Sequence, residues 1–237
     1  GTINYSDLNG SEKYPGKFKV KSGELVYTSQ LTGDELAWAK ELGINTSAYV
    51  VENGKDGVTI EENAEGQKVF KTNWMPDGGM GDANVPSEAR EELSIPDGVE
   101  VIGENALFEA MIGNVIFPSS LIKIEDLGLF SCGLKSAKLP SKLKEIGTSS
   151  FGACYNLEEV SLPNGLEKIG EAAFRQCSKL KEITIPDSVT EIGSNAFTDC
   201  EELTLTIPKS VAEKCFPGKT ADQIKSSFEI IKAVVIK

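Results

Sequence analysis

The sequence contains no histidine among its 237 residues. An imidazole is the general base of Ser-His-Asp and Cys-His catalytic sites and supplies zinc ligands in HExxH metalloproteases. All of these sites are therefore excluded. The stretch Phe216–Thr220 ends like a phosphate-binding loop, but Glu213 stands where that loop requires glycine. We expect a protein that is not an enzyme and has no cofactor.

Positive charge is scarce as well. The chain has 24 Lys and Arg residues against 36 Asp and Glu residues, which gives a net charge of −12. Binding to nucleic-acid phosphates needs a basic patch of some size. Of the regions 1–92, 93–207 and 208–237, only the last carries an excess of positive charge, +3, and this tail is too small for such a footprint. We therefore expect no nucleic acid among the partners.

Long apolar segments are missing too. No run approaches the roughly 18 apolar residues of a transmembrane helix, so the sequence predicts no transmembrane segment. The pattern of a secretory signal peptide is not recognisable either. For an exported protein, we expect the signal or anchor to lie outside this sequence.

What the sequence does contain is a repeat. Six of its ten prolines stand 22 or 23 residues apart. A fixed period of about 20 to 30 residues is typical of a solenoid, in which each turn stacks on its neighbours. These prolines are Pro96, Pro118, Pro140, Pro163, Pro186 and Pro208.

Four further positions keep the same phase as the prolines. An isoleucine follows each of the first five prolines by six residues, and glycine comes next in four of the five turns. These residues are Ile102, Ile124, Ile146, Ile169 and Ile192, then Gly103, Gly147, Gly170 and Gly193. A large apolar residue and a small one complete the pattern: Leu107, Leu129, Phe151, Phe174 and Phe197, then Ala110, Cys132, Cys154, Cys177 and Cys200.

The last complete turn shows how one unit folds. The alternation over Ile183–Ile185 predicts a short strand with one buried face, and Pro186 ends its pairing because it has no backbone donor. Gly193 is predicted to take a positive φ in a sharp turn. Residues Asn195–Phe197 are predicted to form a single helical or 3₁₀ turn that inserts the phenylalanine into the core.

The unit Ile-x-Ile-Pro-x-x-Val-x-x-Ile-Gly-x-x-Ala-Phe-x-x-Cys-x-x-Leu resembles the BspA-like leucine-rich repeat. The resemblance covers roughly residues 90–208. The early turns depart from it, since Leu107 and Leu129 replace Phe, Ala110 replaces Cys and Glu125 replaces Gly. It implies an α/β fold, a right-handed leucine-rich-repeat solenoid with a parallel concave β-sheet. It also implies a bacterial surface or secreted protein, of a kind that often acts in adhesion.

The predicted organisation has three parts. Residues 1–88 form a small α+β N-terminal module or cap, residues 89–208 the solenoid of five full turns and a sixth strand, and residues 209–237 a C-terminal cap. Solenoid ends need such covers. Within the two end parts we expect a strand or two over 17–28, a helix over 34–42, a hairpin over 57–62 and 67–73, short helices over 210–215 and 220–228, and a strand over 233–236.

The cysteines occupy one repeat position in four turns. Equivalent residues of adjacent turns lie about 5 Å apart, one strand spacing. We expect buried, reduced thiols, because parallel side chains disfavour disulfide geometry. Zinc is not expected, since the chain has neither a CxxC pair nor a histidine.

The candidate binding site is the polar side of the predicted strands. Its residues form a hydroxyl-rich stripe with three carboxylates and one lysine, interrupted by the apolar Ile116. The alternative is a merely solvated sheet face, because such residues also favour strands. The candidate residues are Glu92, Ser94, Asn114, Ser136, Lys138, Glu159, Ser161, Glu182, Thr184, Thr204 and Thr206.

Two functions remain open on the sequence. The first is a non-enzymatic protein that binds a protein partner, such as a host or matrix protein, through the concave face, at the cell surface or outside the cell. The second is a structural spacer that displays an N-terminal module for protein or glycan, with Trp38 or Trp74 as stacking platforms.

Overall fold

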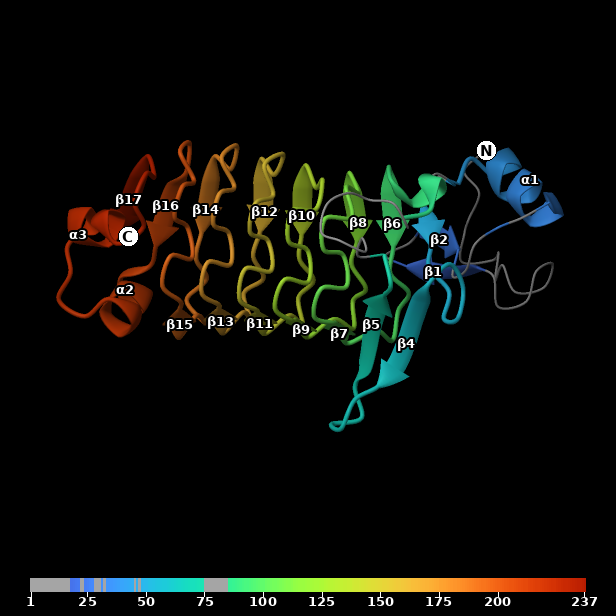
Figure 1. Cartoon of the computed structure of the whole chain (residues 1–237), viewed down its shortest axis with the longest axis horizontal. Helices are drawn as coiled ribbons and strands as arrows, with labels where there is room; N and C mark the ends of the chain where they lie inside the picture. The colour runs from blue at the N-terminus through green and yellow to red at the C-terminus, as the bar shows by residue number, and fades with distance from the viewer. Residues whose placement is uncertain are drawn as a thin grey trace.

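The computed structural model describes residues 18–21, 24–27, 31, 33–44, 46, 48–74 and 85–237. The repeat region is a straight stack of turns along the long axis of the molecule (Figure 1). Each turn contributes two short strands to two different parallel ladders. The α/β leucine-rich-repeat fold predicted from the sequence is thereby confirmed.

The first ladder contains the longer strands, which precede the periodic prolines. They pair in parallel, in a three-stranded sheet β3-β6-β8 and a five-stranded sheet β10-β12-β14-β16-β17. The strands are β3 (Tyr49–Val50), β6 (Glu92–Ser94), β8 (Asn114–Ile116), β10 (Ser136–Lys138), β12 (Glu159–Ser161), β14 (Glu182–Thr184), β16 (Thr204–Ile207) and β17 (Ala233–Ile236).

The second ladder contains the two-residue strands that follow the periodic prolines, together with the longer hairpin β4–β5 at its N-terminal end. Its order is β15-β13-β11-β9-β7-β5-β4, and all pairs are parallel except the terminal hairpin β4–β5. The strands are β4 (Val58–Glu62), β5 (Lys68–Thr72), β7 (Val101–Ile102), β9 (Lys123–Ile124), β11 (Glu145–Ile146), β13 (Lys168–Ile169) and β15 (Glu191–Ile192).

A third segment of each turn follows the glycine and is neither helix nor strand. In the last turn, the amide of Ala196 donates to the carbonyl of Gly193 (3.3 Å) and that of Thr198 to Asn195 (3.1 Å). In the earlier turns, the amides between such donors bond to a carbonyl of the following turn. The amide of Phe174, for example, donates to the carbonyl of Ala196 (2.8 Å). The predicted helical turn is therefore wrong, because half of these donors are used to hold neighbouring turns together. All of these inter-turn bonds run from an N–H to a carbonyl of the next turn.

The repeat glycines serve close packing and not a left-handed turn. Gly193 does not have a positive φ, contrary to the prediction; the left-handed residue is Asn195, at φ 56°. A Cβ on Gly193 would lie 2.3 Å from the amide nitrogen of Glu171, and one on Gly170 would lie 2.6 Å from the carbonyl carbon of Gly147. Only a residue without a side chain lets the backbones approach this closely.

A column of phenylalanines fills the later turns, as the sequence predicts. The rings of Phe151 and Phe174 are stacked with centroids 5.1 Å apart, and those of Phe174 and Phe197 are 5.6 Å apart. Phe228 of the C-terminal cap closes the column edge-on, 5.4 Å from Phe197. These rings are buried in one continuous apolar core that reaches from Val51 to Ile231.

The N-terminal part contributes to both ladders. The predicted hairpin is present as β4–β5, and β5 pairs with β7 of the first repeat. The outer edge of β4 is blocked, because Val58 accepts a bond from the amide of Gly54 (2.9 Å) and Ile60 donates to the side chain of Asn53 (2.8 Å). Farther out lie β1 (Phe18–Lys21), its antiparallel partner β2 (Glu24–Tyr27) and helix α1 (Gly33–Glu41), and a 3₁₀ turn (Ser87–Ala89) leads into β6.

The C-terminal cap has the predicted order of elements. Helix α2 (Lys209–Cys215) begins one residue early, and α3 (Ala221–Ser226) is shorter than predicted. Thr220 and Gln223 form a capping box at the start of α3. The final strand, β17, has the predicted bounds and extends the first ladder by pairing in parallel with β16.

The glycine column predicts that alanine lowers the stability at one glycine and leaves it unchanged or raises it at another. Gly170→Ala should lower the free energy of unfolding by about 2 kcal/mol, because backbone atoms would have to move apart. Gly165→Ala should leave stability unchanged or raise it by about 0.5 kcal/mol, because its Cβ would meet no atom closer than 3.4 Å. Urea denaturation of both variants measures this, and equal effects would contradict the packing role.

The phenylalanine column gives a second prediction. Phe174→Ala should lower the free energy of unfolding by about 3–5 kcal/mol, because the site is fully buried and cannot collapse. Phe108→Ala should cost about 1–2 kcal/mol, because Phe108 is half-buried and stacks on Phe130, at 5.1 Å, outside the buried column. Guanidinium denaturation monitored by circular dichroism compares the two.

Candidate functional site

The structure places the predicted site residues on one side of the first ladder. In each strand the first and third residues face outward and the middle residue faces the core; Ile183, for instance, is buried between the exposed Glu182 and Thr184. We call this surface the long-strand face. It consists of Glu92, Ser94, Asn114, Ile116, Ser136, Lys138, Glu159, Ser161, Glu182, Thr184, Thr204 and Thr206.

In the N-terminal part of the long-strand face, two polar side chains form a hydrogen bond with each other. Asn114 donates to the carboxylate of Glu92 at 2.6 Å, and both side chains are half-buried. The face is then interrupted, since β8 and β10 belong to different sheets. This leaves the stretch from Ser136 to Thr206 as its continuous, better exposed part.

Two carboxylates stand next to each other in this continuous part. Glu159 and Glu182 are register partners of β12 and β14, and both are exposed. Register partners lie about 4.8 Å apart, and like charges so placed destabilise a sheet. Among the described residues, no ion pair includes either carboxylate. Lys181 interacts with Glu159 only through its more distant charge, so the two carboxylates are not paired within the described structure.

The nearest lysine does not neutralise them. Lys181, which precedes Glu182, forms an ion pair with Glu158 at 3.0 Å. The hydrogen bond between these two side chains lowers the pKa of Glu158 and raises the pKa of Lys181. Lys181 is therefore engaged at the margin of the long-strand face, one residue before the carboxylate pair.

The second ladder handles charge in the opposite way. Its exposed positions alternate in sign along the register, through Lys123, Glu145, Lys168 and Glu191. Lys123 pairs with Glu145 at 3.6 Å and Lys168 with Glu191 at 3.4 Å. The same repeat therefore builds one ladder that compensates its own charges and one that does not.

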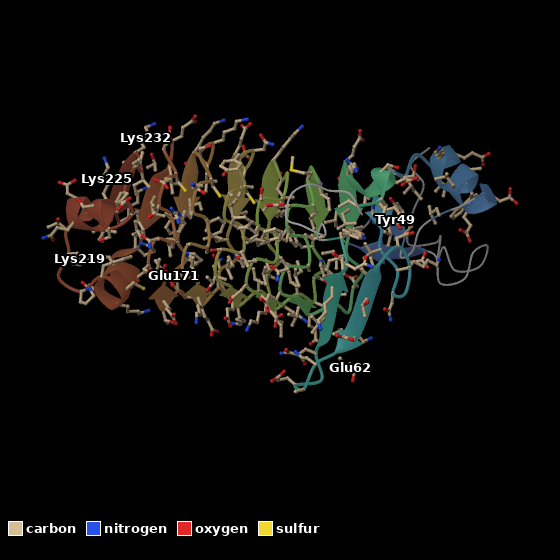
Figure 2. The ribbon with its side chains drawn as sticks, in the orientation of Figure 1. Tyr49, Glu62, Glu171, Lys219, Lys225 and Lys232 are labelled. Atoms are coloured by element: carbon tan, nitrogen blue, oxygen red, sulfur yellow. The ribbon has the colours of Figure 1, made fainter. Side chains whose placement is uncertain are left out.

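A groove of about 590 Å³ lies at the C-terminal end of the long-strand face. It contains two predicted residues and four that the sequence analysis missed. One missed residue directly precedes β14, two come from the loop before β16, and one comes from the segment before β17, which lies outside the proline period. Lys232 is seen beside the end of this ladder (Figure 2). The groove is lined by Lys181, Glu182, Glu201, Glu202, Thr204 and Lys232.

The cysteines are structural, as predicted. All five are free thiols, and the four in the repeat are buried. Each repeat thiol faces a backbone carbonyl, as in the bond from Cys200 to Phe174 (3.0 Å). Burial raises the pKa of Cys132 to about 11, which keeps the unreactive protonated form. Within the described residues, no cluster of Cys, Asp and Glu is arranged to hold a metal ion.

Trp74 of the N-terminal part is not available as a stacking platform for a glycan. This side chain is 1% exposed, and its ring N–H donates to the carbonyl of Asp56 at 2.6 Å. Trp74 is a core residue, so its predicted stacking role is wrong. Trp38 is half-buried against Leu31 and Ala39, in an apolar cluster separate from the solenoid core.

None of the described helices is long and apolar enough to cross a membrane.

Comparison with known proteins agrees with this geometry. The model of the BspA type leucine rich repeat region matches residues 87–204 in six copies. A leucine rich repeat protein of T. pallidum superposes with a TM-score of 0.54 at 19% identity, over 78% of this chain and 100% of that one. No curated protein matches the chain.

Two further solved structures have lower scores. The pneumococcal vaccine antigen PcpA gives a TM-score of 0.41 at 18% identity, over 81% of this chain and 50% of that one. A leucine rich cell surface protein from Faecalibacterium prausnitzii gives 0.28 at 17% identity, over 62% and 60%. The fold, the spacing of its turns and the six matching copies together show that this chain belongs to the BspA type leucine rich repeat family.

Proposed function

We propose that this protein is a non-enzymatic binding protein that recognises a protein partner through the C-terminal half of the long-strand face. The observation that carries the proposal is the pair of neighbouring carboxylates Glu159 and Glu182, which leads into a groove where Glu182, Glu201 and Glu202 outnumber Lys181 and Lys232. A partner that brings lysine or arginine side chains would relieve this repulsion. We infer a basic segment on an extracellular protein, such as a host or matrix protein.

The shape of the surface favours a protein over a small molecule. The exposed residues extend over four turns from Ser136 to Thr206, whereas small-molecule sites are deep and mostly apolar. Charge complementarity on such an open face gives specificity and fast association more than raw affinity. A non-enzymatic role fits the lack of histidine and the burial of the repeat thiols.

The family membership supports a location at the cell surface or outside the cell. Proteins with BspA-type repeats are typically exported, and we infer the same for this chain. Free cysteines do not oppose this location, because the four repeat thiols are shielded by the core.

The spacer function keeps one supporting observation. Helix α1 belongs to the small apolar cluster around Leu31 and Ala39, which is separate from the solenoid core. A module that packs by itself can carry its own binding surface. This function predicts that partner binding follows the residues before Val51 and not the carboxylates of the long-strand face.

Exchange of the carboxylates tests the proposal. The immobilised full chain is presented with purified extracellular matrix proteins, and the affinity of each retained protein is measured by biolayer interferometry. Glu182→Lys combined with Glu202→Lys should weaken binding at least tenfold, about 1.4 kcal/mol, because the partner's basic groups would meet like charge. Binding to the native chain should also weaken as salt is raised from 0.1 to 0.5 M.

The matched control is Glu62→Lys combined with Glu65→Lys, which alters the net charge equally on the β4–β5 hairpin. Both carboxylates are exposed (Figure 2 labels Glu62). This control should bind as the native chain does. Equal losses in the two double variants, or loss only on removal of residues 1–47, would contradict the proposed site and favour the spacer function.

A further inference from the structure

Of the three parts 1–92, 93–207 and 208–237, only the last, which contains the C-terminal cap, has an excess of positive charge. Residues 208–237 contain six lysines and three acidic residues, whereas residues 93–207 carry a net −8. The cap occupies one end of the long axis (Figure 1). Lys219 and Lys225 project at this end, away from the turns (Figure 2). The molecule is therefore electrically polar along its axis.

The charges of the cap are only weakly neutralised within it. Lys209 and Glu213 are 4.0 Å apart and largely exposed, which makes a loose pair. Lys219 donates to the hydroxyl of Ser227 at 3.2 Å and keeps its charge. The other two acidic residues, Asp222 and Glu229, are exposed. Four lysines of the cap then remain besides Lys209 and the groove residue Lys232: Lys214, Lys219, Lys225 and Lys237.

An apolar side chain also protrudes from the cap, between Lys225 and Lys232 in the sequence. Ile230 is 64% exposed, between the buried Phe228 and Ile231. Its φ is 23° and that of Glu229 is 42°. A positive φ is a genuine outlier for a β-branched residue, and such strain persists only where the surrounding structure enforces it. The buried neighbours enforce it here, and the result is an isoleucine held out in solvent.

Lysines and an exposed apolar residue on the same cap match the chemistry of an anionic bilayer. Each lysine near such a surface raises the partition coefficient by about fivefold, and an apolar side chain gains further by entering the interfacial region. An anionic polymer is the alternative ligand, but it would contact the lysines only and would leave the exposed Ile230 without a contact. The acidic solenoid opposes docking little, because at 0.15 M salt charges beyond about 8 Å are screened, a distance of about two turns.

We propose that the C-terminal cap docks on an anionic phospholipid bilayer, with its lysines at the headgroups and Ile230 in the interfacial region. The contact is peripheral and reversible. It directs the long axis away from the lipid, so that the long-strand face remains open to a partner. Membrane docking and partner binding use different residues and can be separated by substitution.

Vesicle sedimentation with the full chain tests this proposal. Vesicles of phosphatidylglycerol and phosphatidylcholine in equal parts should retain at least tenfold more protein than pure phosphatidylcholine in 0.05 M salt, and the difference should shrink in 0.5 M salt. Lys219→Glu combined with Lys225→Glu should lower this partitioning by at least tenfold. Ile230→Ser should lower it by about threefold to tenfold.

The matched control is Lys40→Glu combined with Lys142→Glu, which has the same net charge as the lysine variant. Both control lysines are exposed and lie outside the cap. This control should sediment with the vesicles as the native chain does, and circular dichroism should show all variants folded. The proposal is overturned by equal binding to neutral vesicles, by equal losses in the control, or by an unchanged Ile230→Ser variant. Retention on polyphosphate beads without retention on vesicles would also overturn it.

Discussion

The whole architecture depends on how closely one backbone turn can approach the next. Parallel ladders fix this distance at about 4.8 Å, and the turn segment must keep to it although it is not a strand. Glycine at positions 147, 170 and 193 makes the approach possible, because a Cβ there would collide with backbone of the preceding turn. The stacked phenylalanine rings, with centroids 5.1 to 5.6 Å apart, then fill the interior at nearly the same repeat distance.

The same spacing determines the surface chemistry. Because equivalent residues recur at one fixed distance, each sequence position becomes a line of side chains along the molecule, and the choice of residue decides whether neighbours attract or repel. On the second ladder lysine and glutamate alternate and form ion pairs. On the long-strand face Glu159 and Glu182 adjoin each other without such a pair. This contrast within one repeat is the reason for proposing the long-strand face, and not the second ladder, as the partner surface.

Much of the fold could be predicted from the sequence, since the proline period fixes which residues share a face and which fill the core. Glu182 and Thr204 were placed correctly on one surface for this reason. The role of Gly193 was not predictable from one unit, because the collision that it avoids is with another turn. The groove residues Glu201 and Lys232 were missed because they meet only where β17 adds a strand from outside the repeat. Trp74 was misread because exposure cannot be judged from residue type alone.

The one-way hydrogen bonds of the turn segment have an electrostatic consequence. Each N–H that reaches the following turn, such as that of Phe151 to Ala173 or of Phe174 to Ala196, belongs to a peptide group whose dipole lies along the solenoid axis. These dipoles point the same way in successive turns, so they add as they do in an α-helix. Their positive end faces the C-terminal cap. The segment around the short strands opposes them, because its N–H groups, such as that of Gly193 to Ile169, reach back to the preceding turn. The two sets of dipoles offset one another within each turn, so the positive charge at that end of the molecule comes from the lysines of the cap.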